Sequence, residues 1–333
     1  MSGAGFVNAH THVYSGLASL DMPPPRVAPS CFLEILERVW WRLDRAIDER
    51  TLRAAARFYA ADALRHGTTA IIDHHESPSF IDGSLDVIAD ACQELGVRAV
   101  LCYGATERNG GRDEGRRGLA ECRRFIRSNR RPLVRGVVGL HASFTVSDDT
   151  IREAGELCRE LHTVLHVHVA EDRADVDDAL RRGYGGPVER LQALGALPAG
   201  SILAHGVHLA AAQVRAVDEA GCWVVQNPRS NRHNHVGYPR ALAASTRVAL
   251  GTDGFVSDMR EEISALREDA RQHGEDACVI ERRSAGGQAL VAELCGVPPD
   301  LPAGPDVTDE FMDEIRAEAR EAAVVLWTRM AEL

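Results

Sequence analysis

The sequence contains no lysine, and it has 38 arginines. This absence excludes catalysis through a lysine Schiff base and phosphate binding by a P-loop lysine. It also excludes a carboxylated lysine as the bridge between two metal ions. Any metal site on this chain must therefore use other ligands.

Closely spaced cysteines are also missing. The eight cysteines stand singly in the chain, and no C-x-x-C pair occurs. A thiolate zinc site needs such pairs, so the sequence argues against one. Several cysteines lie within apolar runs, as Cys102 and Cys222 do. We therefore expect buried, reduced thiols in a cytoplasmic protein.

The chain has no run of about 20 apolar residues, so we expect no membrane span. Its first residues carry neither a basic region nor a cleavable apolar segment, which argues against a secretory signal. The formal net charge is −11, whereas phosphate backbones are bound by clustered positive charge. Nucleic acid is therefore not an expected partner. The expected partners are a small-molecule substrate and a second copy of the chain in a homodimer.

Short apolar or β-branched runs alternate along the chain with longer amphipathic runs. Eight runs are typical of strands: Gly5–Asn8, Thr68–Asp73, Arg98–Tyr103, Val134–Leu140, Val164–Val169, Ser201–Ala204, Trp223–Gln226 and Arg247–Leu250. The predicted helices between them include Cys31–His66, Leu85–Leu95, Gly115–Ser128, Asp148–Leu161, Val188–Leu194 and Ala210–Ala220. This alternation indicates βαβ units and a parallel sheet. Eight units favour an α/β fold of the (β/α)8 TIM-barrel type.

Two segments depart from a minimal barrel. Between Tyr14 and Ser30 lies a proline-rich stretch that cannot be regular helix. It follows the first strand on the face where barrel active sites lie, so we predict a lid there. After Gly296, a linker leads to a predicted helix over Thr308–Glu332, with Thr308 as N-cap. We therefore predict a barrel over residues 1–296, and a linker and C-terminal helix over residues 297–333.

Histidines, acids and one amide follow the carboxyl ends of the predicted strands. These residues are His10, His12, Asp73, His74, His75, His141, His168, Glu171, His205, Asn227 and Asp253. A barrel brings all its strand ends together on one face, so these dispersed positions should form one cluster.

The pair His10 and His12 points to one side of an extended segment, because side chains alternate along a strand. Such a pair alone does not establish a metal site. With His168, His205 and Asp253 at matching strand ends, the chain offers a nitrogen and oxygen set suited to zinc or iron. Such a set leaves a position for water.

Five ordered segments resemble the signatures of the amidohydrolase superfamily, and are closest to its aminohydrolase/chlorohydrolase branch. They are NAHTH at 8–12, HVAE at 168–171, AHGVH at 204–208, NPRSN at 227–231 and GTDG at 251–254. That branch includes cytosine, guanine and S-adenosylhomocysteine deaminases and triazine hydrolases. Further segments, such as WWRL at 40–43, look most like the SsnA-type aminohydrolases. The resemblance covers about residues 3–296.

The resemblance implies a ligand set for one divalent metal ion, with zinc expected and iron as the alternative. The implied ligands are His10, His12, His168 and Asp253. Asp253 is also implied as the group that takes a proton from the water that the metal activates.

For the remaining matched positions, the resemblance implies catalytic or substrate-binding roles. Glu171 is implied as the proton shuttle, and His205 as the residue that orients the attacking water or polarises the substrate. His141, Ser230 and Asn231 are implied as substrate contacts.

The implied activity is that of a hydrolase acting on C–N bonds other than peptide bonds. In this reaction a metal-bound hydroxide displaces ammonia from an N-heteroaromatic or amidine-like small molecule. Two alternatives stay open. The same site could hydrolyse a cyclic amide or a carbon–halogen bond, or the chain could be a non-catalytic relative that only binds small molecules.

Several positions depart from the family pattern. Relatives usually carry a β-sandwich domain built from segments on both sides of the barrel, and we expect this barrel to lack it. Gly104 stands where SsnA-type relatives often have an acid, which suggests altered specificity. Arg229 and Arg232 would favour an anionic or carbonyl-rich substrate if they faced the pocket. Trp40 and Trp41 lie in an amphipathic helix, and we interpret them as core side chains.

Overall fold

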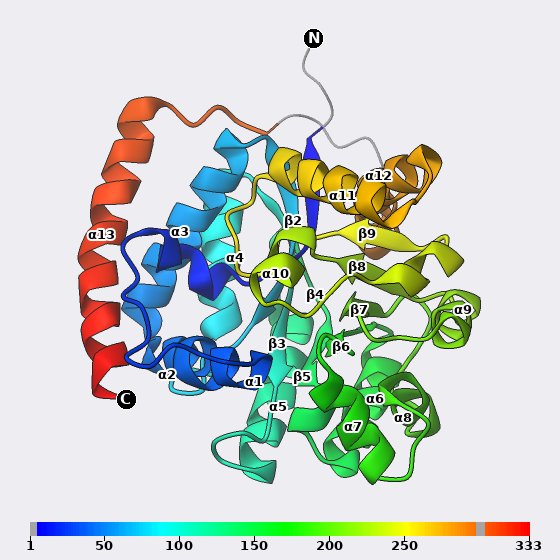
Figure 1. Ribbon diagram of the computed structural model, residues 1–333. Helices are drawn as coiled ribbons and strands as arrows, with labels where there is room; N and C mark the ends of the chain where they lie inside the picture. The colour runs from blue at the N-terminus through cyan, green and yellow to red at the C-terminus, as the bar shows by residue number, and fades with distance from the viewer. Residues whose placement is uncertain (1–4, 298–303) are drawn as a thin grey trace.

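The computed structural model describes residues 5–297 and 304–333 and consists of one strand barrel surrounded by helices (Figure 1). The strands are β1 Phe6–Thr11, β2 Thr68–His75, β3 Arg98–Ala105, β4 Val134–Gly136, β5 Val138–Ala142, β6 Leu165–Val169, β7 Ile202–His205, β8 Trp223–Gln226 and β9 Val248–Leu250. Their order is β1-β2-β3-β5-β6-β7-β8-β9, with the short β4 beside β3. Neighbouring strands are parallel throughout. The predicted (β/α)8 barrel is confirmed.

The barrel closes between its first and last strands. A parallel bridge joins Thr11 to Asp253, just beyond the end of β9. The amides of Thr252 and Asp253 donate to the carbonyl of His10, at 2.9 and 3.0 Å. The seam of the barrel therefore lies at the residues expected to bind metal.

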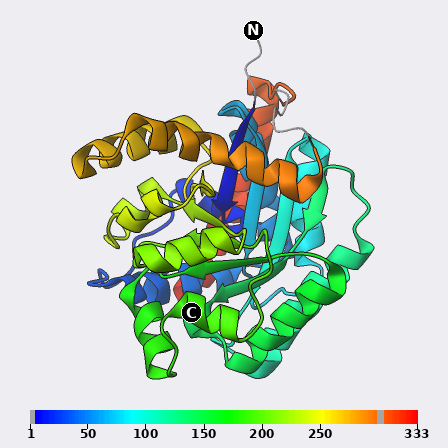
Figure 2. The same cartoon turned by 90° about the vertical axis from the view of Figure 1, so that its right-hand side faces the viewer.

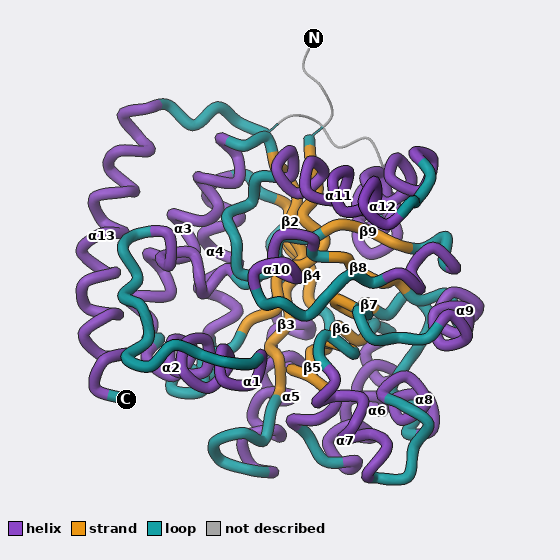
Figure 3. Tube along the Cα trace, in the orientation of Figure 1, coloured by secondary structure: helices purple, strands orange, loops and turns teal. Residues whose placement is uncertain are grey.

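Helices wrap the barrel, as the purple segments around the orange strands show in Figure 3. The α-helices are α1 Phe32–Ile35, α2 Trp41–Ala46, α3 Glu49–Arg65, α4 Ser84–Leu95, α5 Arg112–Ser128, α6 Asp148–Leu161, α7 Arg173–Arg181, α8 Pro187–Ala193, α9 Ala211–Glu219, α10 Pro228–His233, α11 Met259–His273, α12 Ala277–Cys295 and α13 Asp309–Glu332. Short 3-10 or π turns are η1 Val13–Ser19, η2 Leu36–Trp40, η3 Ser143–Thr145 and η4 Arg240–Ala244. Within the described ranges, no helix is both long and apolar enough to cross a membrane.

Alternation along the strands produces two apolar layers. On β2, Ile71 packs outward among the helices, whereas Ile72 packs inside the barrel. The interior layer continues to Leu290 and Val291 of α12, which lies across the amino end of the strands (Figure 2). The centre of the barrel is therefore a packed apolar core.

Two predicted elements are divided in the structure. The predicted helix Cys31–His66 is interrupted between α2 and α3, where Asp48 begins a new helix. Its carboxylate accepts from the amide of Thr51, and the Thr51 hydroxyl closes a capping box. The predicted strand Val134–Leu140 is interrupted at Val137, so that β4 pairs with β3 and β5 continues to β6.

The predicted helix at the end of the chain is present as α13, with the Thr308 side chain as its cap. It packs along α3. All strands within the described ranges belong to the barrel sheet. The division of the chain at residues 296 and 297 stays a prediction. The eight cysteines are free, and Cys31 and Cys278 are exposed, contrary to the expectation of burial.

Candidate active site

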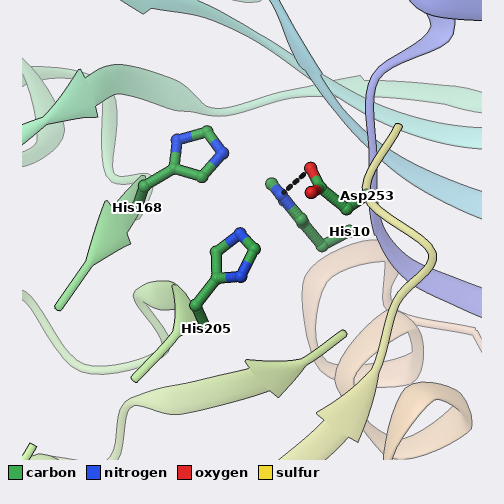
Figure 4. A group of neighbouring side chains, drawn as sticks. All are labelled: His10, His168, His205 and Asp253. Atoms are coloured by element: carbon green, nitrogen blue, oxygen red, sulfur yellow. Dashed lines mark ion pairs between the residues drawn. The ribbon is translucent and has the colours of Figure 1, made fainter. Parts of the chain in front are cut away.

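The carboxyl ends of four strands bring the expected metal ligands and His205 together, and Figure 4 draws His10, His168, His205 and Asp253. His10 lies on β1, and His12 follows its last residue. His168 lies on β6, His205 ends β7, and Asp253 follows β9. Residues more than 240 positions apart in sequence thus face one point, as the barrel topology predicted.

Short distances join these side chains. The Nε2 atom of His12 lies 2.9 Å from Oδ1 of Asp253 and 3.2 Å from Nε2 of His168. The Nε2 atom of His10 lies 3.6 Å from the same Oδ1. Donor atoms of His10, His168, His205 and Asp253 all lie within 4.8 Å of one another. His205 therefore joins the four expected ligands in one cluster of five donors.

Backbone carbonyls determine which ring nitrogen is free in two of these histidines. The Nδ1 atom of His12 lies 2.6 Å from the carbonyl of His74, and that of His168 lies 2.6 Å from the carbonyl of His141. A carbonyl only accepts, so each Nδ1 must carry the proton. When these rings are neutral, their two facing Nε2 atoms are lone-pair acceptors, and this is the form that binds a metal.

A second histidine, and not a backbone carbonyl, holds the His10 ring. Its Nδ1 lies 2.9 Å from Nε2 of His166, whose Nδ1 faces the Cys102 sulfur at 3.7 Å. The buried Nε2 of His10 has no hydrogen-bond partner. His166 thus stands behind His10 as a hydrogen-bonded interior side chain, which is how we interpret it.

Burial and the neighbouring acids shift the pKa values of His10 and His12 in opposite directions. Burial by itself lowers the pKa of His12, but the carboxylates of Asp253 and Glu76 raise this pKa to about 10. Burial dominates at His10 and lowers its pKa to about 3, although Asp253 opposes that shift. A cation at this point, whether a proton or a metal ion, is therefore stabilised by the surrounding acids.

The two carboxylates of the cluster are shifted in opposite directions. Burial and the charge of Asp253 raise the pKa of Glu171 well above its usual range. Burial also acts to raise the pKa of Asp253, but the neighbouring His10 and His12 side chains hold this pKa well below the usual range. Glu171 therefore holds a proton to higher pH than Asp253 does.

Glu171 lies beside His205. Its Oε2 is 3.6 Å from Nε2 of His205, and its Oε1 is 3.4 Å from Nδ2 of Asn234. The Nδ1 atom of His205 lies 3.0 Å from Oδ1 of Asn231. If that contact is an Nδ1–H donation, Nε2 of His205 is a lone-pair acceptor, and Nδ2 of Asn227 lies 3.3 Å from it.

Two expected substrate contacts lie on α10, behind the cluster. Ser230 donates a short hydrogen bond to Oδ2 of Asp253, and Asn231 contacts His205. Both side chains are buried. The structure thus places Ser230 and Asn231 against these two residues, while the third expected contact, His141, lines the cavity.

Left-handed backbone conformations mark the same strand ends. Ala170, His205 and Asp253 have φ values of 50°, 74° and 54°. Residues with a Cβ adopt this region rarely, and such strain concentrates at functional sites.

A cavity of about 50 Å³ lies over the cluster, and it is lined by residues for which we expected other roles. Trp40 and Trp41 border it, so their interpretation as core side chains alone is wrong. Asp44 borders it too, in a buried ion pair with Arg108 at 2.7 Å. Arg108 also stacks over the Trp41 ring at 4.7 Å.

Glu76 is a site residue that the sequence reasoning missed. It lines the cavity at 2% exposure, with Oε1 2.7 Å from Nδ1 of His74 and Oε2 3.5 Å from Nδ1 of His12. Gly104 leaves room for this pair, since a Cβ there would lie 2.4 Å from His74 and 2.5 Å from Glu76. The signal in the sequence was an acid directly after the predicted strand and its two histidines.

Arg229 and Arg232 do not border the cavity. Arg229 pairs with Glu262 on α11, and Arg232 pairs with Asp269 on the same helix. The inference of an anionic or carbonyl-rich substrate from these two arginines is therefore withdrawn.

Comparisons with known proteins agree with this geometry. The profile of the amidohydrolase family matches residues 3–289. A 5'-deoxyadenosine deaminase of Methanopyrus kandleri is 31% identical over 78% of this chain, and an 8-oxoguanine deaminase of Pseudomonas aeruginosa is 30% identical over 87% of it. This chain spans 59% of the length of the Methanopyrus protein and 66% of the Pseudomonas one.

Solved structures share the fold. An adenosine deaminase from Xanthomonas campestris with bound zinc matches with a TM-score of 0.77 and 22% identity, over 98% of this chain and 85% of that one. An atrazine chlorohydrolase from Arthrobacter aurescens, complexed with zinc, matches with a TM-score of 0.70 and 22% identity, over 91% of this chain and 72% of that one. With the family profile covering most of the chain and a matching barrel, this chain belongs to the amidohydrolase family.

Proposed function

We propose that this protein is a metal-dependent aminohydrolase that releases ammonia from an N-heteroaromatic or amidine-like small molecule. The observation that carries the proposal is the convergence of the Nε2 atoms of His10, His12 and His168 near Asp253, with Glu171 beside the cluster. The names of the relatives, which are deaminases of 5'-deoxyadenosine and 8-oxoguanine, support this reaction class.

For the metal, we propose His10, His12, His168 and Asp253 as ligands of one divalent ion, zinc or iron. The orphaned Nε2 of buried His10 fits this role, because a buried nitrogen without a partner is costly unless a ligand occupies it. Three imidazoles and one carboxylate form a donor set that both ions accept. When bound, the ion supplies Lewis acidity and lowers the pKa of a nearby water.

The protein's own groups then handle the protons. Asp253 is held as a carboxylate and can accept a proton from the attacking water. Glu171, whose pKa is raised, can hold a proton, donate it to the ring nitrogen next to the attacked carbon, and later pass one to the departing amino group. His205 faces Glu171 and can stabilise the negative charge that develops on the added oxygen.

The cavity walls support a planar substrate. The rings of Trp40 and Trp41 border the cavity and offer flat apolar surfaces to an aromatic ring. Buried Glu76 offers carboxylate oxygens to N–H donors of that ring. This combination suits an amino-substituted nitrogen heterocycle.

The test is an ammonia-release screen with the metal-loaded protein and a panel of amino-purines, pterins, pyrimidines and triazines. We expect release from at least one compound, and release that is slower by about 10²- to 10⁴-fold from the Glu171→Gln variant. Absence of ammonia release from every compound of the panel would overturn the proposal.

A second candidate function uses the same site to hydrolyse a different kind of bond in the substrate. The structural likeness to an atrazine chlorohydrolase motivates hydrolysis of a carbon–halogen bond, and a cyclic amide is a further option. Product mass separates the three reactions. Binding without turnover, unchanged in Glu171→Gln, would instead identify a non-catalytic relative.

We also propose a homodimer in the cytoplasm. Val27 and Val324 are 62% and 67% exposed, and such side chains can contribute to a contact with a second copy. Light scattering of the purified chain measures its mass in solution, and a monomer at micromolar concentration would contradict the dimer.

A further inference from the structure

The cavity is covered by a segment that we call the roof, residues 20–48, which includes α1, η2 and α2. The side chains of Phe32, Leu36, Trp40, Trp41 and Asp44 from the roof line the cavity. The cavity volume is about 50 Å³. Ligand pockets usually measure roughly 300 to 1,000 Å³, so outward movement of the roof would make more room for a heteroaromatic substrate.

The last turns of α13 contact this roof, although almost 300 residues separate the two in the chain. In Figure 1 the red end of α13 lies beside α2 and the blue segment before it. The indole N–H of Trp327 donates to the carbonyl of Leu20 at 3.0 Å. Arg329 pairs with Asp48 at 2.6 Å.

Two roof arginines reach the end of the helix. Arg42 donates to the carbonyl of Met330 at 2.8 Å, and Arg26 donates to the carbonyl of Ala331 at 3.0 Å. The final carbonyls of a helix have no partner within the helix and carry partial negative charge. The roof arginines therefore cap α13, and α13 in turn holds the roof.

The rest of α13 is anchored independently of the roof. Ion pairs join Glu318 to Arg57 and Asp309 to Arg65, both on α3. Buried Leu326 and Ile315 add apolar contacts with the core. The helix is thus fixed to the barrel along its length, and only its last turns hold the roof.

We propose that Trp327 and Arg42 are positioning residues, which hold the roof over the substrate cavity through the last turns of α13. They act on the reaction through Trp40, Trp41 and Asp44, which the roof carries to the cavity wall. The role of the C-terminal helix is then to set how readily the roof opens and how well it orients the substrate. The contacts that carry this proposal do not depend on the chemistry of the metal centre.

The test compares Trp327→Phe and Arg42→Ala with the unaltered full chain by hydrogen exchange, each protein loaded with zinc. A hydrogen bond contributes about 1 kcal/mol, so each variant should exchange about 5-fold faster across residues 20–48. Exchange in β2 and β6 and the zinc content should not change. Arg42→Lys should recover part of the protection, because lysine can still donate to the Met330 carbonyl.

The matched control is Asp309→Asn, which removes an ion pair of the same helix far from the roof. It should leave exchange in the roof unchanged. Where a substrate is in hand, the two roof-contact variants should raise KM severalfold with a smaller effect on kcat, and the control should do neither. Roof exchange equal to that of the control, or equally faster exchange in the barrel strands, would overturn the proposal. Because exchange is measured without substrate, failure of the proposed deaminase activity would not affect this result.

Discussion

Glu171 and Asp253 illustrate how single residues obtain their chemistry from their surroundings. Both are carboxyl groups in the same cluster, yet burial raises the pKa of Glu171, while two histidines lower that of Asp253. Two similar acids in one cluster therefore have pKa values that are shifted in opposite directions. The sequence identified both residues through their position in motifs, but their protonation depends on contacts that the fold creates.

Replacing Glu171 by Gln should abolish proton transfer and leave the fold and the metal in place. We expect kcat to fall by about 10²- to 10⁴-fold, the usual contribution of a general acid or base. Ammonia release measures the rate, and elemental analysis measures the metal. Glu261→Gln, on the surface of α11, is the control. Activity that survives in Glu171→Gln would remove this residue from the mechanism.

Asp218 links α9 to the loop before β9. Its carboxylate accepts from the Ser245 hydroxyl at 2.7 Å and from the amides of Thr246 and Arg247 at 2.8 and 3.2 Å. Burial alone acts to raise its pKa, but these hydrogen bonds hold the pKa below the usual value. Ionised Asp218 therefore stabilises the folded state at pH values above its unfolded-state pKa of about 4. This stabilisation is lost as the pH falls through the lower pKa of the folded state.

We expect Asp218→Ala to lower the free energy of unfolding by about 1 kcal/mol at pH 7, a value kept small because the side chain is only partly buried. The difference from the unaltered protein should shrink as the pH falls below about 4. Urea unfolding at several pH values measures it. Asp177→Ala, at an exposed position on α7, serves as the control. A difference that does not vary with pH would show that the charge of Asp218 plays no part.

At the scale of elements, α12 approaches the barrel more closely than its sequence pattern indicates. Its Gly286 lies against β9, and a Cβ there would come within 2.0 Å of the Val248 carbonyl oxygen. The neighbouring Gly287 lies against Val7 of β1 in the same manner. A glycine pair inside a helix lowers its intrinsic stability, so only tertiary contact explains this pair.

Gly286→Ala should therefore destabilise the protein, although alanine favours helices. Overpacking costs about 1 to 3 kcal/mol, more than the gain of about 1 kcal/mol in helix propensity. The free energy of unfolding in urea should fall. Ser284→Ala in the same helix should change it by less than about 0.5 kcal/mol. A more stable Gly286→Ala variant would show that the helix can move away from β9 without cost.

For other elements, the sequence alone predicted the boundaries correctly. Asp148–Leu161 and Trp223–Gln226 match α6 and β8 residue for residue, because each has a clear period and clear boundaries. The break between α2 and α3 was missed, although the Asp48 and Thr51 capping box is visible in the sequence. The amphipathic pattern continues across that break and conceals it.

At the scale of the whole molecule, the proposed metal centre ties the two ends of the barrel sheet together, since β1 supplies His10 and Asp253 follows β9. An ion bound there should stabilise the folded barrel, because an ion that binds only the folded state shifts the folding equilibrium.

Chelation should lower Tm by about 5 to 10 °C, and added zinc should restore it. Elemental analysis should find about one zinc or iron per chain, and His168→Asn should reduce this content. The exposed residue His235 provides the control variant His235→Asn, which should retain the metal. Absence of metal after reconstitution would contradict the proposed centre and the hydrolytic function together.

The sequence by itself determined the barrel, the family and the gathering of His10, His12, His168 and Asp253. It could do so because strand periodicity and the motifs at strand ends are local, and the barrel topology brings those ends together. Only the tertiary structure decided which nitrogens are free, how Glu76 joins the cavity, and that α13 holds the roof. These features depend on carbonyls, charges and close contacts supplied by segments far apart in the chain, which no local pattern encodes.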